Sequence, residues 1–129
     1  MREENLALLK RGYEAFSSGD LDTIRGMAHK DEVWTTGGWG DFKPEYKGVE
    51  DVIGYLTKLV EKTDGTFKDE PEAFFADDDQ VTVIEHVTAA RKGRKLDTHF
   101  IHVFDIKDGK VSRVTEYSSE PKKSEEFWS

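Results

Sequence analysis

The sequence contains no cysteine, only three prolines and no long run of apolar residues. The missing cysteine excludes disulfides, thiolate metal sites and a cysteine nucleophile. The N-terminal segment MREENLALLK lacks the apolar stretch that a signal peptide or a membrane span requires. We therefore expect a cytoplasmic protein with no membrane partner.

Positive charge is also scarce, because the formal net charge is −8 and the basic residues are scattered outside the stretch 91–95. We interpret that stretch as a solvated hairpin tip. A surface for nucleic acid needs a continuous basic stripe, so the composition argues against a nucleic-acid partner. A chain of 129 residues with 36% hydrophobic and 12% aromatic content predicts one folded domain rich in packed aromatics.

The first half of the chain predicts helices. Apolar residues at spacings of three and four indicate one amphipathic helix over 3–17 and a second over 49–63. Asp20 is placed to cap a short helix over 21–27, since its carboxylate can accept hydrogen bonds from amides of the first turn. Residues 33–36 indicate a brief strand between these helices.

The segment 37–48 is predicted to be a Gly-rich loop that carries three aromatic residues, Trp39, Phe42 and Tyr46. Aromatics on such a loop suit the lid of an apolar pocket, and they equally suit a loop folded down into the core. Both interpretations stay open at the level of the sequence.

The second half predicts three consecutive strands, 81–91, 94–106 and 110–118, joined by Lys92-Gly93 and Asp108-Gly109 turns. Helices followed by a run of antiparallel strands predict an α+β fold, in which a curved antiparallel sheet wraps around the N-terminal helices.

Polar side chains stand among the apolar ones on these strands. His86, His102 and Glu116 accompany Phe100, Phe104 and Val114, a mixture more typical of a pocket wall than of a plain core. After the strands, we expect residues 119–129 to form an acidic, solvated tail whose Phe127 and Trp128 dock on the domain or on its partner.

Four segments, in order, resemble the SnoaL-like polyketide cyclase family, within the ketosteroid isomerase and nuclear transport factor 2-like superfamily. They are YEAFSSGDLD from Tyr13, DEVW from Asp31, YKGVEDV from Tyr46 and VFDIKDGKV from Val103. The resemblance implies a single domain over residues 1–118, a cone-shaped cystatin-like α+β barrel with a deep pocket, and a homodimer formed through the sheet. It implies no cofactor and no single reaction, because members of one fold carry different activities.

The best-known chemistries of the superfamily do not fit the matched positions. The carboxylate base, the tyrosine and the acidic oxyanion donor of ketosteroid isomerases fall on Thr36, Gly12 and Phe100. The Arg-x-Asp pair and the second Asp of limonene-type epoxide hydrolases fall on His86, Thr88 and Glu116. The resemblance therefore argues against both activities, while a different acid–base pair that includes Glu116 stays possible.

Strand register decides which residues face the pocket, because a slip of one residue exchanges the two faces of a strand. A bulged turn at Asp108-Gly109 places Phe100 opposite Glu116, with His102, Phe104 and Val114 on the same face. A two-residue turn turns His102 away instead. We favour the bulged turn.

The Lys92-Gly93 turn poses the same choice for His86 and Thr88. We expect a bulged turn here also, which points both side chains into the pocket. The alternative, a tight turn, would place them with Asp97 and His99 on a polar outer face.

The resulting hypothesis is a pocket for an apolar, partly oxygenated small molecule. Glu116, His86 and His102 are the candidate catalytic residues, since a buried imidazole–carboxylate pair can exchange protons near neutral pH. A set of two histidines and one carboxylate is also a known metal-binding pattern, but we expect no metal. The candidate ligand-binding residues are Tyr13, Trp34, Phe42, Tyr46, Thr88, Phe100, Phe104 and Val114.

Three functions remain open at this stage. The first is an isomerase or a cyclase, and the second is a binding module that leaves its ligand unchanged. The third is a dimerisation domain whose cavity is filled by its own side chains.

Overall fold

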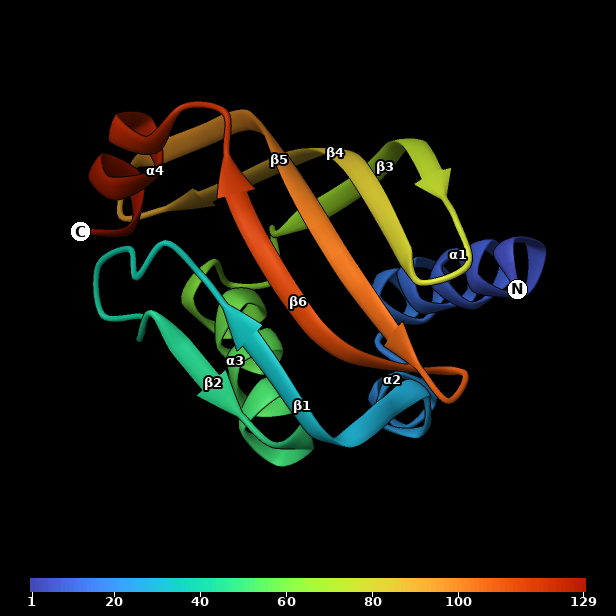
Figure 1. Cartoon of the computed structure of the whole chain (residues 1–129). Coiled ribbons are helices and arrows are strands. Elements are labelled where there is room, and N and C mark those ends of the chain that lie inside the picture. Colours follow the sequence, from blue (N-terminus) through green and yellow to red (C-terminus); the bar gives the residue numbers. More distant parts are fainter.

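The computed structural model describes all 129 residues and contains four helices and one six-stranded sheet (Figure 1). The helices are α1 (Arg2–Ser18), α2 (Leu21–Met27), α3 (Val49–Lys62) and α4 (Pro121–Trp128). The strands are β1 (Ala28–Thr35), β2 (Glu45–Lys47), β3 (Lys68–Ala76), β4 (Gln80–Arg91), β5 (Arg94–Lys107) and β6 (Lys110–Ser118). None of the helices is both long enough and apolar enough to cross a membrane.

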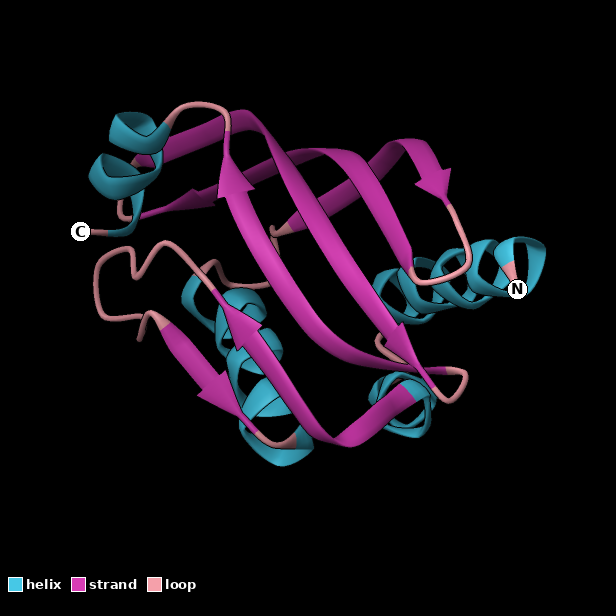
Figure 2. Ribbon diagram, viewed as in Figure 1, coloured by secondary structure: helices cyan, strands magenta, loops and turns pink.

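The sheet has the strand order β2-β1-β6-β5-β4-β3, and only the β1–β6 pair is parallel. It curves without closing, and α1, α2 and α3 lie on its concave side (Figure 2). The predicted α+β cone is therefore confirmed. β1 is longer than the brief strand expected from the sequence, and the Gly-rich loop contains the short strand β2.

The local sequence explains the helix boundaries. The Asp20 side chain accepts a hydrogen bond from the Thr23 amide at 3.1 Å, which caps α2 as predicted. α3 buries one apolar side, and Tyr55 on that side is almost fully covered. This face directs α3 against the sheet.

The aromatics of segment 37–48 divide between core and cavity wall. Phe42 and Tyr46 are 5% and 9% exposed and belong to a core cluster with Tyr55 and Trp128. Trp39 is partly buried against the same cluster. The loop is thus folded down onto the core, and because Trp39 and Phe42 also line the cavity, it forms part of the pocket wall as well.

In the β5–β6 hairpin, His102 and Glu116 face the predicted side of the sheet, but the turn between the strands differs from the predicted one. Its turn is a two-residue one, in which Asp108 and Gly109 both have positive φ (53° and 73°), as a type I′ turn requires. Ser112 is then an additional residue in β6, a bulge that shifts the register by one. His102 therefore lies opposite Glu116, two residues from the expected partner Phe100, and both still face the concave side.

The β4–β5 hairpin contradicts the sequence prediction. Lys92 and Gly93 also have positive φ and form a tight turn, but no bulge follows. His86 pairs with His99, and Thr88 pairs with Asp97, all on the outer face. The prediction that His86 and Thr88 point into the pocket is wrong, because without a bulge the tight turn fixes the opposite parity.

The acidic C-terminal segment, expected as a solvated tail, ends in helix α4. Phe127 and Trp128 are 3% and 4% exposed, so both dock on the domain. Arg91 donates to the Phe127 carbonyl at 3.1 Å and Arg94 donates to the Glu126 carbonyl at 2.7 Å, bonds that hold the C-terminal end of α4 against the β4–β5 hairpin. Trp128 also packs edge-on against Phe42, with ring centroids 4.9 Å apart.

The burial of Trp128 predicts that α4 stabilises the whole domain. Trp128→Ala should lower the free energy of unfolding by about 3–5 kcal/mol, because it removes a large buried side chain and leaves a cavity. Urea denaturation followed by circular dichroism measures the change. Lys122→Ala, an exposed change on the same helix, is the control and should have almost no effect. Equal stability of the two variants would show that α4 is only peripherally attached.

Candidate functional site

A cavity of about 110 Å³ lies between the concave face of the sheet and the helices. Hydrophobic side chains make up 19 of its 25 lining residues, and every helix contributes at least one. The space exceeds what one water molecule needs, which is roughly 10–15 Å³ on the same measure. An apolar wall of this kind, with a few polar groups, is typical of small-molecule sites.

His102 on β5 is the centre of the polar groups in this cavity. Its Nδ1 atom contacts the Glu85 carboxylate of β4, and its Nε2 atom lies 2.9 Å from Glu116 Oε2 on β6. The side chains of all three residues are nearly inaccessible, with exposed fractions of 8% or less. One imidazole is therefore held between two buried carboxylates on three adjacent strands.

Further hydrogen bonds extend this central set at both ends. Trp34 Nε1 donates to Glu116 Oε2 at 3.2 Å, and the Tyr55 hydroxyl donates to the same carboxylate at 3.0 Å. The Tyr13 hydroxyl donates to Glu85 at the other end. Five side chains thus form a connected network from Tyr13 to Tyr55, which we call the His102 network: Tyr13, Glu85, His102, Glu116 and Tyr55. Trp34 supports it from β1.

The carboxylates determine the charge on His102. Burial alone would disfavour the imidazolium, but Glu85 and Glu116 outweigh burial and hold the pKa of His102 well above its ordinary value. Burial and the nearby Glu85 charge raise the pKa of Tyr13, and burial and Glu116 do the same for Tyr55. The network therefore consists of an imidazolium between two acceptors, with two neutral hydroxyl donors.

Two more carboxyl groups line the cavity. Burial and the adjacent Glu85 raise the pKa of Asp69, on β3, well above its usual range. Glu32 on β1 is 4% exposed, and burial alone raises its pKa to about 7. No basic side chain pairs with Glu32, so its carboxyl group stands apart from the His102 network.

Most of the predicted cavity residues are in place. Glu116 and His102 line the cavity together with Tyr13, Trp34, Phe42, Phe100 and Phe104. Val114 faces the same side but is fully covered in the core, and Tyr46 is likewise a core residue. His86 and Thr88 lie on the other face, so the sheet separates His86 from the other two members of the proposed catalytic and metal-binding sets.

Four ionisable cavity residues, Glu32, Tyr55, Asp69 and Glu85, were not predicted from the sequence. For Glu85 a signal existed, because β4 alternates strictly and Val81, Val83 and Val87 share its face. Reading that alternation through residue 85 would have placed a carboxylate inside. Glu32 falls in the part of β1 that the sequence did not predict as strand.

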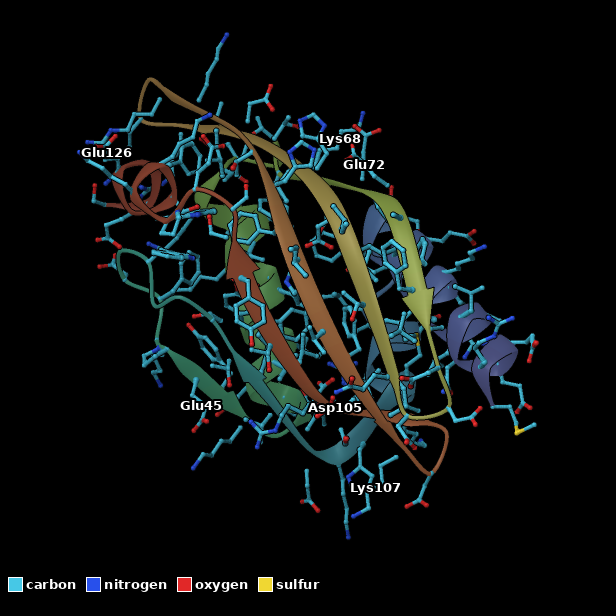
Figure 3. The ribbon with its side chains drawn as sticks, turned by 45° about the horizontal axis from the view of Figure 1, so that its top comes forward. Glu45, Lys68, Glu72, Asp105, Lys107 and Glu126 are labelled. Carbon is cyan, nitrogen blue, oxygen red and sulfur yellow. The ribbon has the colours of Figure 1, made fainter.

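His86 belongs instead to a polar cluster on the outer face. Its Nε2 atom lies 2.6 Å from Asp97, its ring stacks on His99 at 5.1 Å, and His99 lies 2.9 Å from Glu72. Figure 3 looks onto this face of the sheet, with Glu72 near its upper end. The hydrogen bond to Asp97 raises the pKa of His86. This cluster has no access to the cavity.

The buried carboxyl of Glu32 predicts a pH-dependent stability. Its pKa rises from 4.5 to about 7 on folding, so the folded state binds the proton more tightly and stability is lost as pH increases through that interval. A shift of this size corresponds to about 3 kcal/mol. Glu32→Gln, which stays neutral, should therefore be more stable than the wild type at pH 8 and similar to it at pH 4.

Chemical denaturation at several pH values measures the difference between the two proteins. Glu45→Gln on the exposed strand β2 is the matched control and should keep the wild-type pH profile. If the wild type and Glu32→Gln lose stability in parallel between these pH values, the Glu32 carboxyl does not titrate as described.

Comparisons with known proteins agree with this architecture. An uncharacterised protein of Mycobacterium tuberculosis is 26% identical over 127 residues, which cover 98% of this chain and 97% of that protein. Bal32a, from a soil-derived mobile gene cassette, is 32% identical with a TM-score of 0.95, and the match covers 99% of this chain and 98% of Bal32a.

A putative SnoaL-like polyketide cyclase from Jannaschia has the same fold, with a TM-score of 0.81 at 16% identity over 97% of this chain and 94% of that one. The family model of the SnoaL-like domain matches residues 9–114, most of the chain. The protein therefore belongs to the SnoaL-like domain family.

Proposed function

We propose that this protein binds an apolar, partly oxygenated small molecule in the cavity and transfers protons to and from it, as an isomerase or a cyclase does. The observation that carries the proposal is the pair His102–Glu116, with Nε2 and Oε2 2.9 Å apart, in a cavity whose lining is mostly hydrophobic. Acid–base catalysis needs a positioned group that can both give and take a proton near neutral pH.

Glu116 is the group of the pair that can reach a ligand. Both nitrogens of His102 face carboxylates, so the imidazole has no free N–H for a substrate. Glu116 receives hydrogen bonds from His102, Trp34 and Tyr55, and it lines the cavity. In the proposed mechanism, Glu116 takes a proton from one atom of the ligand and returns it to another, while the hydrogen bond from the His102 imidazolium stabilises the carboxylate.

Glu85 completes the arrangement as a positioning residue. It contacts His102 on the side away from Glu116, and this fixes the ring orientation and favours the charged imidazole. The apolar surroundings strengthen each of these interactions, because water competes weakly inside the cavity. A carbonyl or hydroxyl group on the ligand would find hydrogen-bond partners at this wall.

Replacement of Glu116 tests the proposed reaction. A thermal-shift screen with terpenoid, steroid and polyketide-like compounds first identifies ligands that raise the melting temperature. Product analysis by mass spectrometry then detects turnover of those ligands. Glu116→Gln should reduce turnover at least about 100-fold while the fold is kept, since general acid–base groups contribute 10²–10⁴-fold. Glu61→Gln, on the exposed side of α3, is the matched control. Undiminished turnover in Glu116→Gln would remove Glu116 from the mechanism.

The second candidate function is binding without catalysis. The full engagement of both His102 nitrogens favours it, because such a network also serves as a rigid polar wall. A ligand that stabilises the wild type and Glu116→Gln equally, and that is recovered unchanged, would select this function.

We also propose that the protein is a homodimer that pairs through the outer face of the sheet. Ile84, Ile101 and Tyr117 form one cross-strand row over β4, β5 and β6. Tyr117 and the nearby Phe75 are 54% and 59% exposed, so large apolar side chains gather on this solvent-facing side of the sheet. The same face carries the His86 cluster, which supplies polar contacts at the margin of the row.

A charge placed in this row should prevent association. Ile101→Asp is expected to convert a dimer into a monomer, because an unpaired carboxylate would be buried at the centre of the contact. Sedimentation equilibrium at micromolar concentration measures the mass. Val60→Asp, at an exposed apolar position of α3, is the control and should remain a dimer. A monomeric wild type, or a dimeric Ile101→Asp, would contradict the proposed interface.

A further inference from the structure

The cavity has a marked imbalance of ionisable groups. Its lining contains four carboxyl side chains, Glu32, Asp69, Glu85 and Glu116, but neither lysine nor arginine. The only basic side chain is His102, and its two nitrogens are already taken by Glu85 and Glu116. A ligand that enters with a negative charge would therefore find no positive partner inside.

The Glu32 carboxyl group is not bonded to any member of the His102 network. It is 4% exposed, it lines the cavity, and its carboxyl group makes neither a hydrogen bond nor an ion pair with another side chain. Its backbone is fixed, because the Glu32 carbonyl accepts from the Gly48 amide at 2.8 Å. A buried carboxyl group held in place without a partner is costly unless something supplies a hydrogen bond or a positive charge.

Aromatic side chains provide the second half of the site. Trp34 follows Glu32 by two residues on β1 and lines the same cavity, and its ring lies 5.7 Å from that of Tyr55. Faces of Trp and Tyr rings attract organic cations. A carboxyl group that lines the same cavity as such rings is a combination that suits an ammonium group attached to an apolar body.

We infer that the ligand of this cavity carries a basic nitrogen, and that Glu32 anchors it as an ammonium–carboxylate pair while the apolar part of the ligand lies against the aromatic wall. The inference rests on the proposed function of the cavity as a ligand site, and it adds the ligand class. The oxygenated group that approaches Glu116 and the amine that approaches Glu32 are then two separate ends of one molecule. Acidic ligands are excluded by the same charges.

Three ring compounds of similar size test the ligand class: benzylamine, benzyl alcohol and benzoate. Isothermal titration calorimetry with the wild-type protein should show benzylamine binding at least about tenfold more tightly than benzyl alcohol, and no binding of benzoate. In Glu32→Gln the preference for the amine should fall to within about twofold, while binding of benzyl alcohol is unchanged. Glu45→Gln on β2, labelled in Figure 3, is the matched control and should retain the full preference.

A pH series on the wild type gives a test that needs no variant. Other ionisable groups facing the cavity are Tyr13 on α1, Tyr55 on α3, Asp69 on β3, Glu85 on β4, His102 on β5 and Glu116 on β6. An ammonium group binds the ionised form of Glu32, whose pKa in the free protein is about 7. Affinity for benzylamine should thus rise about tenfold from pH 6 to pH 8, with one proton released on binding at pH 6. The alcohol shares every other contact and should show no such rise.

The outcomes separate the two proposals. If benzyl alcohol binds as tightly as benzylamine, or if benzoate binds, the cavity is a ligand site but the amine inference is wrong. A flat pH dependence for benzylamine, or an unchanged preference in Glu32→Gln, overturns it as well. Absence of binding by all three compounds and by toluene would overturn both the ligand class and the proposed function of the cavity.

Discussion

The buried contact of His102 with Glu85 and Glu116 is the interaction on which the candidate site depends. Burial of three ionisable groups is unfavourable unless each charge finds a partner. Here one imidazolium serves two carboxylates, and Trp34, Tyr55 and Tyr13 supply the remaining hydrogen bonds. Because these partners come from five different elements, the network also fixes how the helices sit on the sheet.

The polar network occupies one wall of the cavity. Apart from Glu32 and Asp69, the rest of the lining is mainly aromatic and aliphatic, and Trp39, Phe42 and Trp128 lie where segment 37–48 packs against α4. The Gly40 backbone lies so close to the Trp128 carbonyl that a Cβ atom would be 2.1 Å from its oxygen, so the loop and α4 fit together only with glycine there. The C-terminal helix is therefore part of the pocket.

The two faces of the sheet have separate chemistry. The concave face holds the carboxyl-rich cavity, and the outer face holds the apolar row of Ile84, Ile101 and Tyr117 beside the His86 cluster. In both cases histidine is paired with carboxylate, but only the concave pair is shielded from water. Since solvent screens exposed pairs, the proposed proton transfer is assigned to the cavity pair His102–Glu116 rather than to His86.

Apolar periodicity, turn residues and four family-like segments in the sequence determined the α+β class, three of the helices and the order of the last three strands. The sequence also placed Glu116 and His102 on the concave face. That placement is correct because the bulge at Ser112, which the sequence did not predict, offsets the change of face that the two-residue turn alone would have caused. Only the tertiary structure decided that His86 faces outward, since a single residue of register separates the two faces. Likewise, only packing between distant elements brought Asp69, Tyr55 and Glu32 to one cavity, because such contacts depend on where strands and helices meet in space.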